Sequence, residues 1–128
     1  MPTVAAAIII HDHKIFITQR PEGKSLAHHW EFPGGKQEKD ETLPQTLKRE
    51  IKEELNIDAK VGDFFMSSSY QYEFGQIDMH CFFVSVDSPQ ISSNEHEATA
   101  WVSAQELKNY TFAPADIPIV DALCKLDI

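Results

Sequence analysis

The chain has 128 residues, of which 42% are hydrophobic, a size and composition that fit one compact domain over residues 1–128 and exclude a disordered protein. Twenty acidic residues outweigh eleven basic ones, and the resulting net charge of −9 argues against binding to nucleic acid polymers or anionic membranes. No apolar run is long enough to span a membrane, and residues 4–10 lack the flanks of a secretion signal, so a cytoplasmic location is expected.

The first third of the chain is expected to form short strands. Residues 3–10 are apolar and rich in β-branched side chains, which is typical of a buried strand. Residues 15–19 predict a second strand, and residues 25–29 a loop. Residues 30–32 predict another short strand, closed by a turn at residues 33–35 that contains one proline and two glycines.

A helix is predicted over residues 42–55, because apolar residues recur there every four positions. Either Thr42 or Glu41 is suited to cap its N-terminus, and Asn56 is suited to end it in a left-handed conformation. The recurring apolar residues are Leu43, Leu47, Ile51 and Leu55.

The second half of the chain returns to strand patterns. Residues 64–74 and 77–86 flank Gly75 and Gln76, which predicts a long antiparallel hairpin that turns at these two residues. Residues 98–102 predict a further short strand.

Two short helices are expected near the C-terminus. Ser103 is suited to cap a helix over residues 104–108, and a last helix is expected from Asp116 to about residue 126. The residues of this last helix predicted to face inward are Ile117, Val120, Leu123 and Cys124. Strands outnumber helices, so the expected fold class is α/β (α+β), with one mixed sheet between helices.

Three glutamates lie unusually close to the apolar stripe of the first helix. Glu50, Glu53 and Glu54 have i, i+3, i+4 spacing, which puts them on one face, about 80° from the centre of the stripe. Like charges at this spacing destabilise a helix, and a divalent cation would remove the conflict. Clustered carboxylates favour Mg²⁺, for which Mn²⁺ can substitute. The helix alone fits a solvated acidic face equally well.

The segment before the helix strengthens the case for a binding site. Gly34 and Gly35 are flexible residues that allow a backbone to approach a metal ion or a phosphate closely. Lys36 is suited to neutralise phosphate charge. A plain turn is the simpler interpretation of this segment when it is considered alone.

Together these features resemble the signature of the Nudix family: Gly, five residues, Glu, seven residues, then Arg-Glu-apolar-x-Glu-Glu-x-Gly-apolar. Eight of its nine specified positions agree with this sequence. The agreeing residues are Gly35, Glu41, Arg49, Glu50, Ile51, Glu53, Glu54 and Ile57. The departure is Asn56 in place of glycine, and asparagine also tolerates the left-handed conformation, so the turn is expected to survive.

The resemblance covers nearly the whole chain. Residues 15–20 and 30–36 look like the MutT branch of the family, and residues 113–118, with Glu95 and His96 before them, look most like its CTP pyrophosphohydrolases. The resemblance implies a Nudix-type α/β/α sandwich, and it implies Mg²⁺-dependent hydrolysis of nucleoside triphosphates to a monophosphate and pyrophosphate. Substrates such as CTP, 5-substituted dCTP or 8-oxo-dGTP, and a role in nucleotide-pool sanitation, are expected. The partner would be a small nucleotide, and the protein a monomer or small homo-oligomer.

Two other functions stay open from the sequence. One is hydrolysis of a different nucleoside diphosphate derivative, such as ADP-ribose or a dinucleoside polyphosphate. The other is a nucleotide sensor without catalysis, although sensors of this family often have a degraded signature and every acid is present here.

The resemblance also implies roles for the residues of the signature. Glu53 and Glu54 would bind metal, together with the backbone carbonyl of Gly35. Glu50 is expected to be the general base and to touch the metal as well. Arg49 would hold Glu50 or a neighbouring acid in place, the alternative being a surface ion pair. Glu41 belongs to the catalytic set, or it supports the helix N-terminus.

One metal ligand is expected outside the signature. Glu95 matches the position of a loop glutamate that binds metal in MutT-like proteins, and Glu97 is the competing candidate. Loop acids are commonly only solvated, so the spacing leaves a choice between the two.

Substrate contacts are expected from the loops and from the last helix. Arg20 would contact phosphate, and Asp116 stands where MutT-like proteins read the nucleobase. Asp116 is alternatively the N-cap of the last helix. An ionised Asp116 accepts hydrogen bonds from the amino groups of cytosine or guanine, which uracil and thymine lack. The full expected substrate-binding set is Arg20, Phe32, Gly34, Gly35, Lys36 and Asp116.

Overall fold

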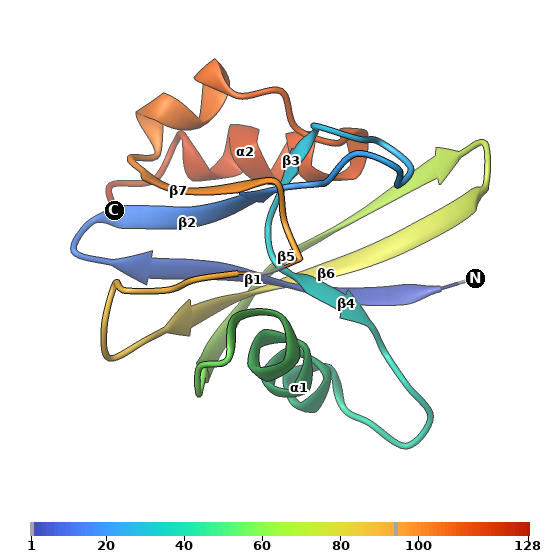
Figure 1. Cartoon of the computed structure of the whole chain (residues 1–128), viewed down its shortest axis with the longest axis horizontal. Helices are drawn as coiled ribbons and strands as arrows, with labels where there is room; N and C mark the ends of the chain where they lie inside the picture. The colour runs from blue at the N-terminus through green and yellow to red at the C-terminus, as the bar shows by residue number, and fades with distance from the viewer. Residues whose placement is uncertain (1, 94) are drawn as a thin grey trace.

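The computed structural model describes residues 2–93 and 95–128. These residues form a mixed sheet with helices on both faces (Figure 1). The central strand order is β3-β2-β1-β6-β5, with β4 paired to β1 and β7 paired to β2. The β1–β6 pairing is parallel and the other strand pairings are antiparallel. The strands are β1 (Thr3–His11), β2 (Lys14–Gln19), β3 (Trp30–Glu31), β4 (Gly34–Lys36), β5 (Lys60–Tyr72), β6 (Gly75–Ser85) and β7 (Ala98–Val102). The predicted α/β sandwich around a mixed sheet is confirmed.

Strand β1 lies at the centre of the sheet and is buried on both faces. Because successive side chains of a strand point to opposite faces, Ala5, Ala7 and Ile9 join one core cluster while Ala6 and Ile8 join the other. The first cluster packs against helix α1 (Leu43–Leu55), and the second against helix α2 (Ile117–Leu123). Figure 1 shows these two helices on opposite sides of the sheet.

Helix α1 begins and ends at the predicted residues. The backbone N–H of Gln45 donates to the Thr42 hydroxyl, and the Gln45 side chain accepts from the Thr42 N–H, so Thr42 rather than Glu41 is the cap. Asn56 ends the helix at φ 55° and ψ 39°, the expected left-handed conformation. Leu47, Ile51 and Leu55 are buried as predicted.

Two strand predictions are wrong in detail. Residues 34–36, expected as part of a turn, form β4, whose glycines allow close pairing with Ala5 and Ala6 of β1. The hairpin turns at residues 73–74 rather than at Gly75 and Gln76, because Tyr72 pairs with Gly75. Strand β5 also begins at Lys60, four residues before the predicted start.

The C-terminal helices differ from the prediction as well. Residues Gln105–Asn109 form a 3-10 helix, with the Glu106 N–H donating to the Ser103 hydroxyl. A second 3-10 turn, Pro114–Asp116, precedes α2 and changes its phase. Ile117 is therefore exposed, and Ile119 is buried in its place beside Val120 and Leu123.

None of the helices within the described residues is both long and apolar enough to cross a lipid bilayer.

Candidate active site

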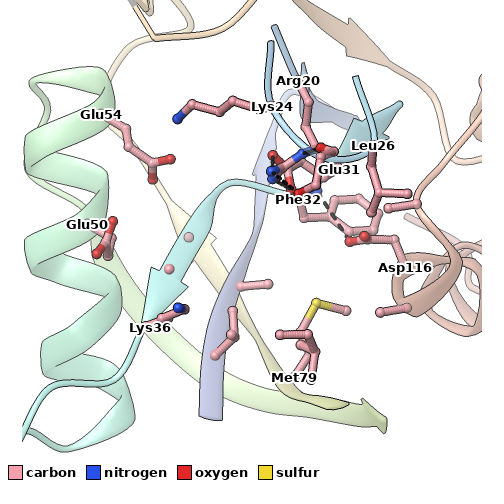
Figure 2. A pocket seen from close by; sticks show the side chains of 18 of the residues that line it. Arg20, Lys24, Leu26, Glu31, Phe32, Lys36, Glu50, Glu54, Met79 and Asp116 are labelled. Atoms are coloured by element: carbon pink, nitrogen blue, oxygen red, sulfur yellow. Dashed lines mark hydrogen bonds and ion pairs between the residues drawn. The ribbon is translucent and has the colours of Figure 1, made fainter. Parts of the chain in front are cut away.

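A cavity of about 540 Å³ lies between α1, β4 and the turn before α2. Figure 2 shows Glu50 and Glu54 reaching into it from α1, with Asp116 on the opposite side. The signature residues therefore line the same cavity as a residue more than 60 positions away, although α1 and α2 cover opposite faces of the sheet (Figure 1). The cavity is lined by acidic side chains near α1 and by apolar side chains such as Phe32 and Met79 near Asp116 (Figure 2).

The three glutamates of α1 do not share one environment. The side chains of Glu50 and Glu54 are 19% and 13% exposed and line the cavity. The Glu53 side chain is 58% exposed, lies outside the cavity lining and approaches Arg49 at 3.5 Å. The helix thus presents two carboxylates to the cavity and one to its rim.

Glu54 carries an unsatisfied carboxylate oxygen. Its Oε2 atom is buried and has no hydrogen-bond partner within residues 2–93 and 95–128. Burial, reinforced by the nearby charges of Glu50, Glu31 and Glu95, raises the pKa of Glu54 to about 8. A buried acceptor without a donor is costly, and a bound cation would satisfy it.

The backbone at Gly35 lies close to the end of the Glu50 side chain. A Cβ atom on Gly35 would lie 2.6 Å from each Glu50 carboxylate oxygen, well inside van der Waals contact. The backbone of β4 therefore passes directly beside this carboxylate. Burial raises the pKa of Glu50, and Arg49 opposes that shift.

Arg49 joins the helix, the preceding loop and β4. Its guanidinium donates to Glu41 at 2.6 and 3.0 Å, to Glu50 Oε1 at 2.8 Å and to the carbonyl of Lys36 at 3.1 Å. The hydrogen bonds from Arg49 lower the pKa of Glu41 to about 2. Arg49 thus makes the predicted contact with Glu50, and Glu41 supports the N-terminal turn through Arg49 and the Thr46 hydroxyl.

Of the two candidates in the loop before β7, Glu95 lines the cavity and Glu97 does not. Even so, within the described part of the chain no three His, Cys, Asp or Glu side chains lie close enough together to form a metal cluster. Glu50, Glu54 and Glu95 each line the cavity and offer carboxylate oxygens to it, while Glu53 stays outside it. Oxygen donors together with the unpartnered Glu54 Oε2 fit a hard divalent cation.

The cations near the cavity have different partners. Arg20 is held by both carboxylate oxygens of Glu31 at 3.2 Å and by the carbonyl of Ser25 at 2.7 Å. Lys24 and Lys36 also line the cavity, and neither has an ion-pair partner among the described residues. Figure 2 shows the Lys24 amine directed toward the acidic end.

The opposite end of the cavity is built around Asp116. Its side chain makes no capping bond to α2, so the interpretation of its side chain as an N-cap is wrong; Oδ1 instead accepts from the Phe32 N–H at 3.5 Å. Burial and the charge of Glu31 raise the pKa of Asp116 well above its ordinary value, which favours the neutral carboxyl. The Tyr72 hydroxyl accepts from the Ala115 N–H at 2.9 Å and thereby ties the hairpin to this turn.

Sequence reasoning assigned no role to three residues with ionisable side chains that line the cavity. Glu31 was seen only as part of a strand, Lys24 fell in a loop without a motif, and His96 was noted only as a neighbour of Glu95. Charged residues next to the segments of the signature were the available signal. Which of them point inward depends on the path of the loops.

The chain matches the model of the NUDIX domain over residues 1–123, and it belongs to the NUDIX family. It is 41% identical over 126 residues to a protein of Escherichia coli named CTP pyrophosphohydrolase, an alignment that covers 98% of this chain and 93% of the relative. It is 33% identical over 121 residues to an 8-oxo-dGTP diphosphatase of Haemophilus influenzae, covering 94% of this chain and 89% of that protein.

Solved structures show the same similarity. The solution structure of the E. coli ORF135 protein is 40% identical and superimposes with a TM-score of 0.83, covering 97% of this chain and 89% of that one. A MutT protein from Methanosarcina mazei superimposes with a TM-score of 0.87 at 22% identity, over 97% and 93% of the two chains, and this match bears on the fold alone. The predicted membership of the family is confirmed. Enzymes of this family generally use divalent metal ions, and the oxygen donors described above fit such an ion.

Proposed function

We propose that this protein is a Mg²⁺-dependent nucleoside triphosphate pyrophosphohydrolase, with Mn²⁺ able to substitute. The observation that carries the proposal is the buried, unpartnered oxygen of Glu54 at one end of a cavity whose other end holds the buried Asp116. One end suits a cation with its phosphates, and the other suits a nucleobase. The relatives named CTP pyrophosphohydrolase and 8-oxo-dGTP diphosphatase support the same conclusion.

Glu50, Glu54 and Glu95, together with the carbonyl of Gly35, would hold the divalent ion. When bound, the ion neutralises phosphate charge and acidifies a water molecule. Glu53 is at the rim, so its role as a ligand stays a prediction that rests on the family pattern.

Glu50 would act as general base toward the attacking water. The Arg49 guanidinium donates to its Oε1 atom at 2.8 Å, which holds the carboxylate in a fixed orientation beside the cavity. The water would attack the α- or the β-phosphorus and break the P–O bond that joins the α- and β-phosphates, and the products would be a nucleoside monophosphate and pyrophosphate. Positioning and electrostatic stabilisation of the phosphoryl oxygens would supply most of the rate enhancement.

Positive charge for the phosphates would come from Lys36 and Arg20, while Phe32 and Gly34 would border the substrate. Gly34 has no room for a side chain, because a Cβ atom there would meet the Ala5 carbonyl oxygen.

Asp116 would recognise the base by hydrogen bonds, and its carboxyl would be neutral rather than ionised as the sequence argument takes it to be. The sequence argument takes an ionised carboxylate, whereas burial favours the neutral acid. A neutral carboxyl both donates and accepts, so it matches cytosine, where N3 accepts beside the N4 amino group, and guanine, where O6 accepts beside the N1 hydrogen. Discrimination against uracil and thymine then depends on more than the charge of Asp116.

The decisive experiment is a panel of ordinary and damaged nucleotides with Mg²⁺, in which pyrophosphate is measured separately from phosphate. Pyrophosphate from CTP, 5-substituted dCTP or 8-oxo-dGTP is expected, and hydrolysis in ¹⁸O water identifies the phosphorus that is attacked. Glu54→Gln and Glu53→Gln should each lower turnover by orders of magnitude, with Glu97→Gln as the matched loop control. Full activity in both helix variants would contradict the assignment of the metal ligands.

The same panel separates the alternatives. Cleavage of ADP-ribose or of a dinucleoside polyphosphate in preference to triphosphates would assign the protein to another substrate class. Tight nucleotide binding without turnover would identify a sensor. The cytoplasmic location, the single domain over residues 1–128 and the monomeric or small homo-oligomeric state stay predictions.

A further inference from the structure

His96 is a buried imidazole between the loop before β7 and helix α1. Its side chain is 6% exposed, and it lies next in sequence to Glu95. Its ring lines the cavity, yet none of the steps above uses it. An imidazole at this depth normally has a partner for each ring nitrogen, and those partners indicate its role.

Both nitrogens of His96 face polar atoms from different elements. Nδ1 lies 2.7 Å from the Ser93 hydroxyl oxygen, and Nε2 lies 3.7 Å from Glu54 Oε1. The second distance is longer than a hydrogen bond and corresponds to an electrostatic contact. The imidazole thus connects the loop to the carboxylate that has an unpartnered second oxygen.

One tautomer of His96 accounts for all the contacts along this connection. The Glu95 backbone N–H donates to the Ser93 hydroxyl oxygen at 3.2 Å, so the Ser93 O–H is free to donate to His96 Nδ1. With Nδ1 as acceptor, the ring hydrogen is on Nε2, the nitrogen that lies 3.7 Å from Glu54 Oε1. The backbone of one cavity acid is therefore linked through Ser93 and His96 to the carboxylate of another.

We propose that His96 is a positioning residue that orients the Glu54 carboxylate and fixes the Glu95 loop relative to α1. This inference rests on the proposed function, because it takes Glu54 and Glu95 to be ligands of one divalent ion. An N–H directed at Oε1 leaves Oε2 as the oxygen that faces the ion. Partners of this kind around metal ligands commonly change metal affinity by about 10–100-fold when they are removed.

The test measures Mn²⁺ binding by electron paramagnetic resonance of the free ion, so it does not depend on turnover. His96→Asn keeps a polar atom near Ser93 but is too short to reach Glu54, and it should weaken Mn²⁺ binding about 10–100-fold. His96→Gln places an amide N–H near the position of Nε2 and should recover most of the loss. His80→Asn is the matched control, since His80 lies outside the cavity lining and pairs with Asp78.

Turnover supplies a second readout that loss of packing would not reproduce. In His96→Asn, kcat at low Mn²⁺ should fall and should rise again as Mn²⁺ is increased, with little change in the KM for nucleotide. In a Glu54→Gln background, His96→Asn should cause little further loss, because its effect acts through Glu54. Losses that multiply in the double variant would refute the inference.

The remaining results of the Mn²⁺ titration also support or overturn the proposed role of His96. Wild-type Mn²⁺ affinity in His96→Asn overturns the proposal, as does a wild-type chain that binds no Mn²⁺. If melting curves show that His96→Asn does not fold, Ser93→Ala removes only the hydroxyl and must still weaken Mn²⁺ binding. A wild-type chain that binds Mn²⁺ but releases no pyrophosphate refutes the proposed function alone, and the Mn²⁺ titration still decides the role of His96.

Discussion

Substitution by alanine should have different consequences at the two adjacent glycines of β4, Gly34 and Gly35. A Cβ on Gly35 would meet the end of the Glu50 side chain at 2.6 Å, and ordinary contact begins at 3.4 Å, so the carboxylate must withdraw by about 0.8 Å. A Cβ on Gly34 would meet the carbonyl oxygen of Ala5, a backbone atom inside the sheet that cannot withdraw. Gly35→Ala should therefore impair catalysis, and Gly34→Ala should impair folding.

The sizes of the two effects follow from what has to move. Displacing a catalytic group by about 1 Å costs on the order of 100-fold in rate, so Gly35→Ala should lower kcat by about that factor. Its stability should change by less than about 1 kcal/mol, because a flexible side chain absorbs the clash and alanine restricts the unfolded chain. Gly34→Ala should lose about 3 kcal/mol, since the sheet backbone has to shift.

The assay combines pyrophosphate release with thermal unfolding of both variants. Gly35→Ala combined with Glu50→Ala should be no slower than Glu50→Ala alone, because the glycine substitution acts through that carboxylate. A Gly35→Ala variant with wild-type kcat would refute the reasoning. So would a Gly35→Ala variant that unfolds as early as Gly34→Ala.

Three further predictions concern single residues. The Asp116 carboxyl has its ordinary pKa of 3.8 in the unfolded chain and a higher pKa in the native protein. Between these two pKa values the native state binds more protons than the unfolded state, so the free energy of unfolding falls as the pH rises through that window. Asp116→Asn, which cannot ionise, should therefore unfold at a higher temperature than wild type at pH 8, with a smaller difference near pH 4; an equal difference at both pH values would contradict the shift. Lys24→Met should raise the KM for a triphosphate about tenfold with little change in kcat, because Lys24 lines the cavity beside Arg20 and has no ion-pair partner among the described residues. Lys39→Met, outside the cavity, serves as the control, and an unchanged KM in Lys24→Met would exclude a phosphate contact of Lys24. Asn56→Ala should lower the free energy of unfolding by about 1 kcal/mol in urea titrations, because alanine is strained at φ 55°. Asn56→Gly should not lower it, since glycine adopts this conformation without strain, and equal stability of the two variants would argue against the strain.

The sequence predicted α1 accurately because local interactions determine it. Its apolar period, the Thr42 cap and the left-handed Asn56 are all properties of neighbouring residues. The α2 prediction was less accurate, since the 3-10 turn before it shifts the phase and exposes Ile117. Strand β4 was missed for the opposite reason, because three residues containing two glycines become a strand only through pairing with β1.

The signature by itself determined the family and the chemistry expected of it. Glu50 and Glu54 share a helix face because of their spacing in the sequence alone, so placing them together required no tertiary structure. Only the tertiary structure separated Glu53 from these two, and only it showed that Arg20 is held by Glu31. It also brought Asp116 and His96 to the cavity from distant segments, since their positions depend on sheet pairing and loop paths rather than on local spacing. Burial, which raises the pKa of Asp116 and leaves the Glu54 oxygen without a partner, is likewise a property of the packed molecule.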